Sequence, residues 1–267
     1  MNIINIPAEK WYDAIQLRRS RRKFLSKPID TQDIDHLKEL CAILNSSIEG
    51  VRVVFTPEGP QPVLKGVIGS FGKIKGAPAY TTLIGDIKKP NVQEKVGYIG
   101  ECFVLEATSM GLATCWVGGL FRPEVVKEQI HVKDNEEVLA ILTVGYVGNE
   151  YGFAEKVIYG KTPKHKRKSL ESLCEGLPQD EWPEWIRSAL GAARLAPSAY
   201  NRQPWRFLVQ KDSIKIYVDN SQNSSHITKR LDCGIAMLHL EIGVLYRGVW
   251  GKWEYLHSPD VARFMVW

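Results

Sequence analysis

The chain has too few cysteines, in the wrong pattern, for a disulfide scaffold or a cysteine-based zinc site. Five occur among 267 residues, and no Cys-x-x-Cys pair is present. Disulfide-rich domains and zinc sites need cysteines in sets at regular spacings. We therefore expect reduced thiols, which are typical of a cytoplasmic protein.

Long hydrophobic runs are also absent. Residues 138–147 form the most apolar run, which is shorter than the roughly 20 residues of a membrane-spanning helix. Residues 234–250 form a longer run, but Glu241 and Arg247 interrupt it. The first residues lack the positive region and apolar core of a secretory signal. The sequence predicts a soluble, cytoplasmic protein without a membrane partner.

Motifs of several enzyme classes are missing as well. No Gly-x-Gly-x-x-Gly follows a predicted strand, and neither Gly-x-Ser-x-Gly nor His-Glu-x-x-His occurs. Gly160-Lys161-Thr162 resembles the end of a P-loop, but Glu155 replaces the required earlier glycine. These absences argue against a serine hydrolase, a P-loop nucleotidase and a metal site.

What is present is an ordinary globular composition with a mild positive charge. The chain holds 35 Lys and Arg against 30 Asp and Glu, a net charge of +5. That excess is too small to indicate nucleic acid, and it fits an anionic small molecule equally well. The length suits one large domain or two small ones.

Hydrophobic periodicity predicts helices and strands along most of the chain. The expected helices cover residues 11–19, 31–43, 91–110, 123–129, 183–195 and 230–246. The expected strands cover residues 51–55, 79–84, 113–117, 138–146, 206–210, 214–218 and 250–256. The strand at 138–146 is almost continuously apolar, which favours a central place in its sheet. Residues 148–177 are polar and basic, and we expect an irregular connection there.

The first candidate binding motif is Arg18-Arg19-Ser20-Arg21-Arg22. Cations and a hydroxyl at a helix end can hold a phosphate with charge-assisted hydrogen bonds. The alternative is a basic turn that faces solvent, as runs of charge usually do.

A second basic run, Lys-Thr-Pro-Lys-His-Lys-Arg-Lys, covers residues 161–168. It suits a further phosphate-binding segment or a nucleic-acid patch. An exposed linker is the simplest alternative. Few aromatic residues interleave the run, so single-stranded nucleic acid is a poor fit.

The segment at residues 196–205 is more specific. Pro197 and Pro204 restrict the backbone around Ser198, Asn201 and Gln203. Amide side chains offer donors and acceptors, which suit a heterocycle edge with alternating carbonyls and ring nitrogens. A structural turn between a helix and a strand is the alternative.

A fourth segment, residues 111–119, ends a predicted strand with Trp116, Val117, Gly118 and Gly119. Glycine lets the backbone approach a flat ligand closely. Taken alone, the segment is better explained as a buried strand followed by a turn.

Together these segments resemble the FMN-dependent nitroreductase family. Its members carry an Arg-Arg-Ser-x-Arg-like motif, matched by residues 18–22, and a Gly-Leu-x-x-x-Trp-x-Gly-Gly-like strand end, matched by residues 111–119. They also carry Ala-Pro-Ser-x-x-Asn-x-Gln-Pro-Trp-x-Phe, matched by residues 196–207, and a Lys-x-Arg-Lys-like clamp, matched by residues 165–168 with Lys164 as a replacement cation. The resemblance covers nearly the whole chain.

The order of the motifs departs from that family. The Asn-x-Gln-Pro-Trp motif usually follows the Arg-Arg-Ser motif within a few tens of residues, whereas here it follows the clamp. Family members are interlocked dimers in which these two motifs reach one flavin from different subunits. The chain is therefore similar to a single-chain, pseudo-dimeric branch in which two subunits are fused and one of two sites is lost.

The resemblance implies an α+β fold with two related halves in a pseudo-two-fold arrangement. Each half would hold a mainly antiparallel sheet flanked by helices, in three layers (αβα). The halves are expected at residues 1–160 and 161–267, tightly docked. The protein would be a monomer that acts as a pseudo-dimer, with a further oligomer left open.

One FMN per chain is also implied, between the halves. The arginines, Ser20 and His165 would hold the phosphate, the turn at 197–203 would line the ring, and the strand end would lie near its reactive edge. The implied cofactor-binding residues are Arg18, Arg19, Ser20, Arg22, Trp116, Val117, Gly118, Gly119, His165, Arg167, Pro197, Ser198, Ala199, Asn201 and Gln203.

On this resemblance the protein is an oxidoreductase that takes a hydride from NADH or NADPH at the flavin N5. Electrons would then pass to a small acceptor such as a nitroaromatic or a quinone. No catalytic side chain is expected, because the flavin carries the chemistry. Gly118 stands where some members have an acid, so water would supply protons.

The alternatives are a flavin-binding protein without turnover, a basic-surface binding module and a purely structural pseudo-dimer; no nucleic-acid partner is expected.

Overall fold

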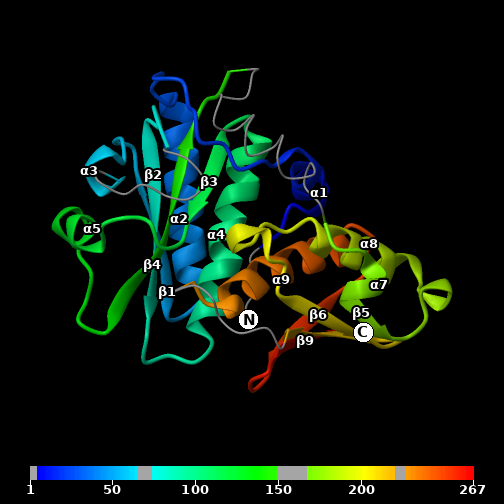
Figure 1. Ribbon diagram of the computed structural model, residues 1–267. Helices are drawn as coiled ribbons and strands as arrows, with labels where there is room; N and C mark the ends of the chain where they lie inside the picture. Colours follow the sequence, from blue (N-terminus) through cyan, green and yellow to red (C-terminus); the bar gives the residue numbers. More distant parts are fainter. Residues whose placement is uncertain (1–4, 65–73, 149–166, 220–226) are drawn as a thin grey trace. The chain divides into compact units, whose positions relative to one another are not determined.

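The computed structural model describes residues 5–64, 74–148, 167–219 and 227–267 (Figure 1). The chain divides into two compact units, each assembled from separate stretches of sequence. Unit 1 consists of Met1–Gln16, Gln93–Cys102 and Arg167–Trp267, and unit 2 consists of Leu17–Val92 and Phe103–Lys166.

Unit 2 is built on a four-stranded antiparallel sheet. Its strand order is β1 (Val51–Thr56), β2 (Ala79–Asp86), β4 (Glu136–Gly145) and β3 (Ala113–Val117). Strand β2 is buried along nearly its whole length and β4 along its second half. The inner place of β4 confirms the expectation from its apolar run, since a strand covered on both faces needs apolar side chains throughout.

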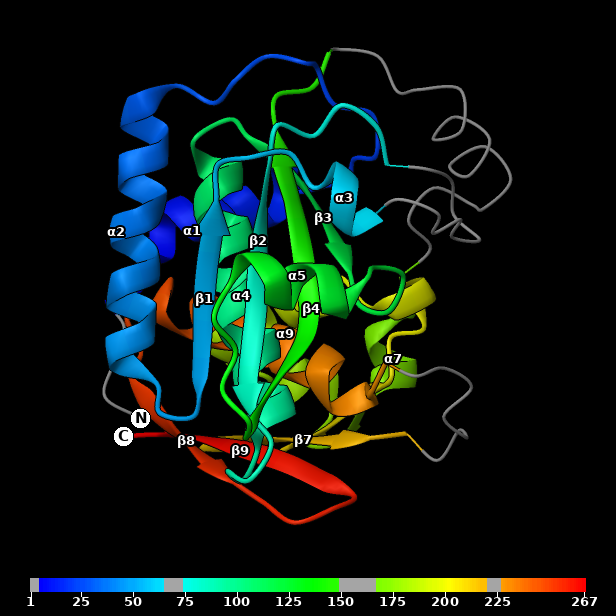
Figure 2. The same cartoon turned by 90° about the vertical axis from the view of Figure 1, so that its left-hand side faces the viewer.

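Helices cover both faces of this sheet (Figure 2). Helix α2 (Thr31–Ser47) and the second part of α4 (Val92–Ser109) lie on one face, and α3 (Gln61–Leu64) and α5 (Pro123–Gln129) lie on the other. The core beneath α3 and α5 consists of Val63, Tyr80, Val117, Val125, Val126 and Ile141.

Unit 1 is built on a five-stranded sheet. Its strand order is β5 (Cys174–Gly176), β6 (Trp205–Val209), β7 (Ser213–Val218), β9 (Asp260–Val266) and β8 (Gly251–Tyr255). All neighbouring pairs are antiparallel except β5 and β6, which are parallel. Both sheets of the chain are therefore mainly antiparallel, as expected.

The helices of unit 1 are α1 (Ala8–Leu17), the first part of α4, α7 (Leu170–Leu173), α8 (Glu184–Arg194) and α9 (Lys229–Leu245). Helix α9 is buried along almost its whole length. It packs against α8 on one side and against β6, β7 and β9 on the other. A helix enclosed in this way must be apolar nearly all round, which explains the long hydrophobic stretch near residues 234–250.

Helices α4 and α9 approach each other backbone to backbone within unit 1. A Cβ on Gly97 would lie 2.1 Å from the carbonyl oxygen of Leu231, and a Cβ on Gly234 would lie 2.0 Å from that of Glu94. Only glycine fits at such a distance. Beside this crossing, Arg230 forms an ion pair with the buried Glu94 carboxylate.

Some elements of the structure differ from the sequence expectations. Strand β9 was not predicted, although it lies inside its sheet between β7 and β8. Residues 148–177 were expected to be irregular, but their described part contains α7 and β5. Elements as short as α7 and β5 give too few positions for a periodic pattern, and the conformation of β9 depends on the strands with which it pairs.

The architecture is α+β, with two mainly antiparallel sheets flanked by helices. The pseudo-two-fold arrangement and the division into halves at residue 160 stay predictions. Within the ranges that the structure describes, no helix is both long and apolar enough to cross a membrane.

Candidate functional site

The segment with the most specific sequence motif forms a strained turn in unit 1. The short helix η2 (Ala199–Asn201) connects the end of α8 to β6. Tyr200, Asn201 and Gln203 have φ angles of 54°, 54° and 48°. Residues other than glycine rarely adopt this left-handed region, and the surrounding structure must enforce the conformation where they do.

Hydrogen bonds within the turn close it. The Ser198 hydroxyl accepts the backbone N–H of Gln203 at 3.0 Å, and the Gln203 side-chain amide donates to the carbonyl of Asn201 at 3.0 Å. The buried Gln203 side chain also accepts the backbone N–H of Lys168 at 2.8 Å. Gln203 therefore shapes the turn from inside, while Asn201 is exposed.

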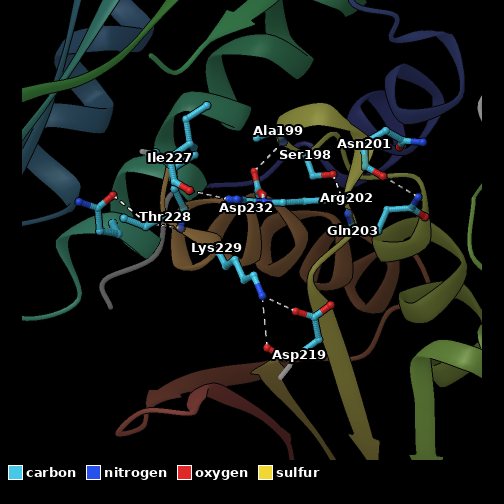
Figure 3. Close-up of polar contacts among 12 residues, drawn as sticks. Ser198, Ala199, Asn201, Arg202, Gln203, Asp219, Ile227, Thr228, Lys229 and Asp232 are labelled. Atoms are coloured by element: carbon cyan, nitrogen blue, oxygen red, sulfur yellow. Dashed lines mark hydrogen bonds and ion pairs between the residues drawn. The ribbon is translucent and has the colours of Figure 1, made fainter. Parts of the chain in front are cut away.

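A buried carboxylate lies behind the turn (Figure 3). Asp232 is on the first turn of α9 and is 1% exposed. Its Oδ1 accepts the backbone N–H of Ala199 at 3.0 Å, and its Oδ2 accepts the Nε–H of Arg202 at 2.6 Å. Arg202 also donates from Nη2 to the carbonyl of Ile227 at 2.9 Å. Each oxygen of Asp232 thus has a partner from the turn.

The environment of Asp232 changes its protonation. Burial raises the pKa of Asp232 from 3.8 to about 6, although the charge of Arg202 and the hydrogen bonds from Ala199 and Arg202 oppose the rise. Taking a carboxylate out of water disfavours its charged form. With a pKa of about 6, the group is still mainly ionised at neutral pH, so it meets Arg202 there as an ion pair.

Arg167, from the predicted phosphate clamp, reaches the same turn. Its Nη1 donates to Asn201 Oδ1 at 2.9 Å, and its Nη2 donates to the carbonyl of Leu195 at 2.9 Å. The structure therefore places two predicted cofactor residues, Arg167 and Asn201, in direct contact. A guanidinium beside an exposed amide can bind a phosphate or the polar edge of a ring.

Three more cations surround the base of the turn. The Lys168 ammonium donates to the carbonyl of Gln203 at 3.0 Å. Asp219 pairs with Lys229 at 2.7 Å and with Arg206 at 3.5 Å. Burial lowers the pKa of Lys168, and the charges of Arg206 and Lys229 add to the effect. The three cations of this cluster outnumber its one carboxylate, Asp219, so the cluster has a net positive charge. That charge favours an anionic ligand nearby.

In unit 2, the basic segment at residues 18–22 runs beside the start of β3. Ser20 forms a parallel bridge with Thr114, and the Arg21 N–H donates to the Thr114 carbonyl at 2.9 Å. The Arg22 carbonyl accepts the N–H of Lys75 at 2.9 Å. The backbone of the segment is therefore held on both sides.

The low solvent exposure of residues 18–22 distinguishes this segment from an ordinary basic turn. Arg18 is 5% exposed, and Arg19, Ser20 and Arg22 are half-buried. Charged runs on a solvated face are normally exposed. A turn that simply faces solvent is therefore a poor description of residues 18–22.

The second motif of unit 2 follows the same strand. Strand β3 ends at the buried Val117, preceded by the half-buried Trp116. Gly118 is half-buried and Gly119 is exposed, in a bend beyond the strand. The structure thus links the basic segment to the Trp116–Gly119 bend through one strand.

The predicted cofactor residues fall into two groups, one in each unit. Those of unit 2 are Arg18, Arg19, Ser20, Arg22, Trp116, Val117, Gly118 and Gly119. Those of unit 1 are Arg167, Pro197, Ser198, Ala199, Asn201 and Gln203. His165 and most of the basic run at 161–168 lie outside the described residues. That both groups bind one flavin stays a prediction.

Sequence reasoning missed the two residues behind the turn, Arg202 and Asp232. Arg202 stands inside the specific motif, but at a position that the motif leaves open. Asp232 carries no signal of its own, because acids are common in the first turn of a helix, where they suit the dipole. Among the residues whose placement is described, no group of side chains could hold a metal ion.

Comparison with known proteins gives a family and a fold. A family model described as "Putative TM nitroreductase" matches residues 10–244. A crystal structure titled "putative nitroreductase", from Thermotoga maritima, has a TM-score of 0.64 and 19% sequence identity. That match covers 99% of this chain and 97% of the other.

Other solved structures match a smaller part of this chain. A nitroreductase family protein from Clostridium difficile 630 is 20% identical with a TM-score of 0.47, covering 64% of this chain and 98% of that one. An FMN-dependent nitroreductase from Clostridium difficile R20291 is 18% identical with a TM-score of 0.41, covering 56% and 95%. Among curated proteins, none matches the chain.

Proposed function

Since the chain belongs to the "Putative TM nitroreductase" family, we propose that it is an FMN-dependent oxidoreductase that uses NADH or NADPH. Its acceptor would be a nitroaromatic, a quinone or a similar small molecule. Membership of this family supports an oxidoreductase activity, and the side chains described next support FMN as the cofactor.

The observation that carries the proposal is the turn at residues 198–203. Its backbone keeps three residues other than glycine in the left-handed region, at the motif expected to line the flavin. A protein without a ligand there could use glycine at these positions without strain. The conformation presents an exposed Asn201 in contact with the guanidinium of Arg167.

The donor set fits FMN. The ligand has a dianionic phosphate and a ring edge with alternating carbonyls and nitrogens. The arginines of residues 18–22 and Arg167 suit the phosphate, because one guanidinium group can donate two parallel hydrogen bonds to two phosphate oxygens. Ser198 and Asn201 offer a hydroxyl and an amide for the ring edge.

The roles of the chain's own residues follow from this assignment. Arg18, Ser20, Arg22 and Arg167 bind the phosphate, and Ser198 and Asn201 orient the ring. The backbone N–H groups of Gly118 and Gly119 would stabilise negative charge at the ring edge. When bound, FMN supplies hydride acceptance and electron transfer. Because Gly118 has no side chain, water supplies the protons there.

One site per chain is part of the proposal. The residues proposed to hold the cofactor are found in both units. On this proposal a single chain would act as a pseudo-dimer, with halves at 1–160 and 161–267. The cytoplasmic location stays a prediction from the cysteine pattern.

The first experiment measures flavin stoichiometry in the purified protein after incubation with FMN. We expect one FMN per chain and oxidation of NADH or NADPH when a nitroaromatic or quinone is added. Two FMN per chain would contradict the single site. A protein that binds FMN and oxidises neither reductant would be the flavin-binding protein without turnover.

The second experiment tests whether both units contribute to the site. Arg22→Gln in unit 2 and Asn201→Asp in unit 1 should each weaken FMN binding about tenfold, because each removes a hydrogen bond to a charged or polar ligand group. Arg122→Gln is the matched control, since Arg122 is half-exposed and pairs with Glu124. A variant with unchanged affinity would remove that residue from the site.

A further inference from the structure

The turn at residues 198–203 needs an external support. Three of its residues occupy a region of φ that side chains disfavour, and such conformations persist only when the surrounding structure enforces them. The Ser198 hydroxyl and the Gln203 amide close the turn internally. Those two contacts lie within the turn and cannot fix it to the rest of unit 1.

Lys168 and Arg167 reach Gln203 and Asn201 from one side of the turn, and Asp232 adds a connection to α9. Its two oxygens accept the N–H of Ala199 and the Nε–H of Arg202, one at each end of η2. Arg202 then reaches the carbonyl of Ile227, which precedes the N-cap residue of α9, Thr228. The turn and the start of α9 are therefore joined by one network (Figure 3).

The carboxylate is poorly placed for any direct contact with a ligand. Asp232 is 1% exposed, and both of its oxygens are already used by the turn. An amide at this position would offer only one accepting oxygen, and its NH₂ group would face a guanidinium donor. The contacts thus call for a carboxylate specifically, although a buried charge costs stability.

We infer that Asp232 is a positioning residue, which acts through Ala199 and Arg202 to hold Ser198 and Asn201 in the orientation that binds the flavin ring. This inference rests on the proposed function. Its structural half, that Asp232 holds the turn, can be tested without any flavin.

The test compares two variants that each remove one carboxylate from α9, the buried Asp232 and the half-buried Glu241. Asp232→Asn breaks the network behind the turn. Glu241→Gln is the matched control, because Glu241 accepts from Tyr98 at 2.7 Å and from Trp253 at 2.8 Å, and glutamine can still accept both. Both variants should keep the near-UV circular dichroism of the unmodified protein.

The first readout is amide hydrogen exchange of a peptide covering residues 196–207, in the absence of FMN. We expect exchange about tenfold faster in Asp232→Asn than in Glu241→Gln, with peptides from β4 unchanged, because local opening follows local stability. Equal exchange in the two variants would overturn the inference.

The second readout is FMN affinity, measured by quenching of flavin fluorescence. A turn that is only partly in the binding conformation weakens apparent affinity by the populated fraction, so Asp232→Asn should bind about tenfold more weakly than Glu241→Gln. Faster exchange with unchanged FMN affinity would overturn the link to the flavin. Failure of the unmodified protein to bind FMN would overturn the proposed function itself.

If Asp232→Asn does not fold, Arg202→Gln tests the same network from the less buried side, since the Arg202 side chain is 16% exposed. The same two readouts apply. If Asp232→Asn does fold, a double variant with both changes should lose no more affinity than the stronger single variant, because the two residues act as one unit. Additive losses would show that they act separately.

Discussion

The crossing of α4 and α9 gives the sharpest test of the structure. Both glycines at the crossing, Gly97 and Gly234, lie against a backbone carbonyl of the other helix, at Leu231 and Glu94 respectively. A carbonyl cannot rotate away as the end of a side chain can. Gly234→Ala therefore forces the two helices apart or distorts one of them.

The size of the effect follows from the distance. A Cβ on Gly234 would lie 2.0 Å from the Glu94 oxygen, whereas ordinary contact begins at 3.4 Å, so the backbones must separate by about 1.4 Å. Overpacking of this kind costs about 3 kcal/mol or more, and the gain in helix propensity from alanine returns about 1 kcal/mol. We expect a net loss of about 2 kcal/mol in the free energy of unfolding.

Gly191→Ala is the matched control. Gly191 lies within α8, and a Cβ there would meet nothing within 4 Å. Gly191→Ala gains the higher helix propensity of alanine without a steric clash, so it should stabilise the protein by about 1 kcal/mol. The two variants should therefore differ by about 3 kcal/mol.

The assay is urea unfolding followed by far-UV circular dichroism. A shift of the midpoint at constant slope reports stability alone. Gly97→Ala should cost a similar amount, and the two substitutions together should cost less than their sum, because the first already opens the crossing. If Gly234→Ala is as stable as Gly191→Ala, the helices do not touch as described, and the reasoning fails.

Three further changes should alter stability in distinct ways. The hydrogen bond from Arg52 lowers the pKa of Glu136 to about 2, so this carboxylate contributes stability above its unfolded pKa that is lost as the pH falls towards 2. Glu136→Gln should cost about 1 kcal/mol at neutral pH, a discounted figure for a partly exposed pair, and nothing near pH 2. The pH dependence of the stability from Asp232 has the opposite sign, because its pKa is raised to about 6. Its contribution to the free energy of unfolding is complete below pH 3.8 and is lost as the pH rises through 6, by up to about 3 kcal/mol. The stability of the unmodified protein relative to Asp232→Asn should therefore fall between pH 4 and pH 7 in urea unfolding, and a difference that grows with pH would contradict the shift. Thr228→Ala removes the hydroxyl that accepts the Leu231 N–H at the start of α9 and should lower the melting temperature, at a cost of about 1 kcal/mol.

Local patterns predicted most of the elements closely. The helix expected at 91–110 is α4 (Val92–Ser109), and the strand expected at 113–117 is β3 (Ala113–Val117). Both are long or apolar enough for periodicity to be read directly. Strand β9 escaped prediction because its identity depends on pairing with β7 on one side and β8 on the other.

In the candidate site too, some features could be predicted from the local sequence and others depend on tertiary packing. Pro197 and Pro204 bracket the turn in the sequence, so its location could be predicted. The left-handed conformation of Tyr200 and Gln203 could not, because neither residue type favours it. Packing enforces that conformation, partly through Asp232, which lies on a different element.

The sequence alone determined the family motifs, the expected phosphate and ring contacts, and the order of most helices and strands, because these depend on residue type and short spacing. Tertiary structure alone decided which distant groups meet. It pairs Asp232 with Arg202, Arg167 with Asn201 and Gly234 with the Glu94 carbonyl. Such partnerships depend on burial and on chain segments brought together by folding, and no local pattern records them.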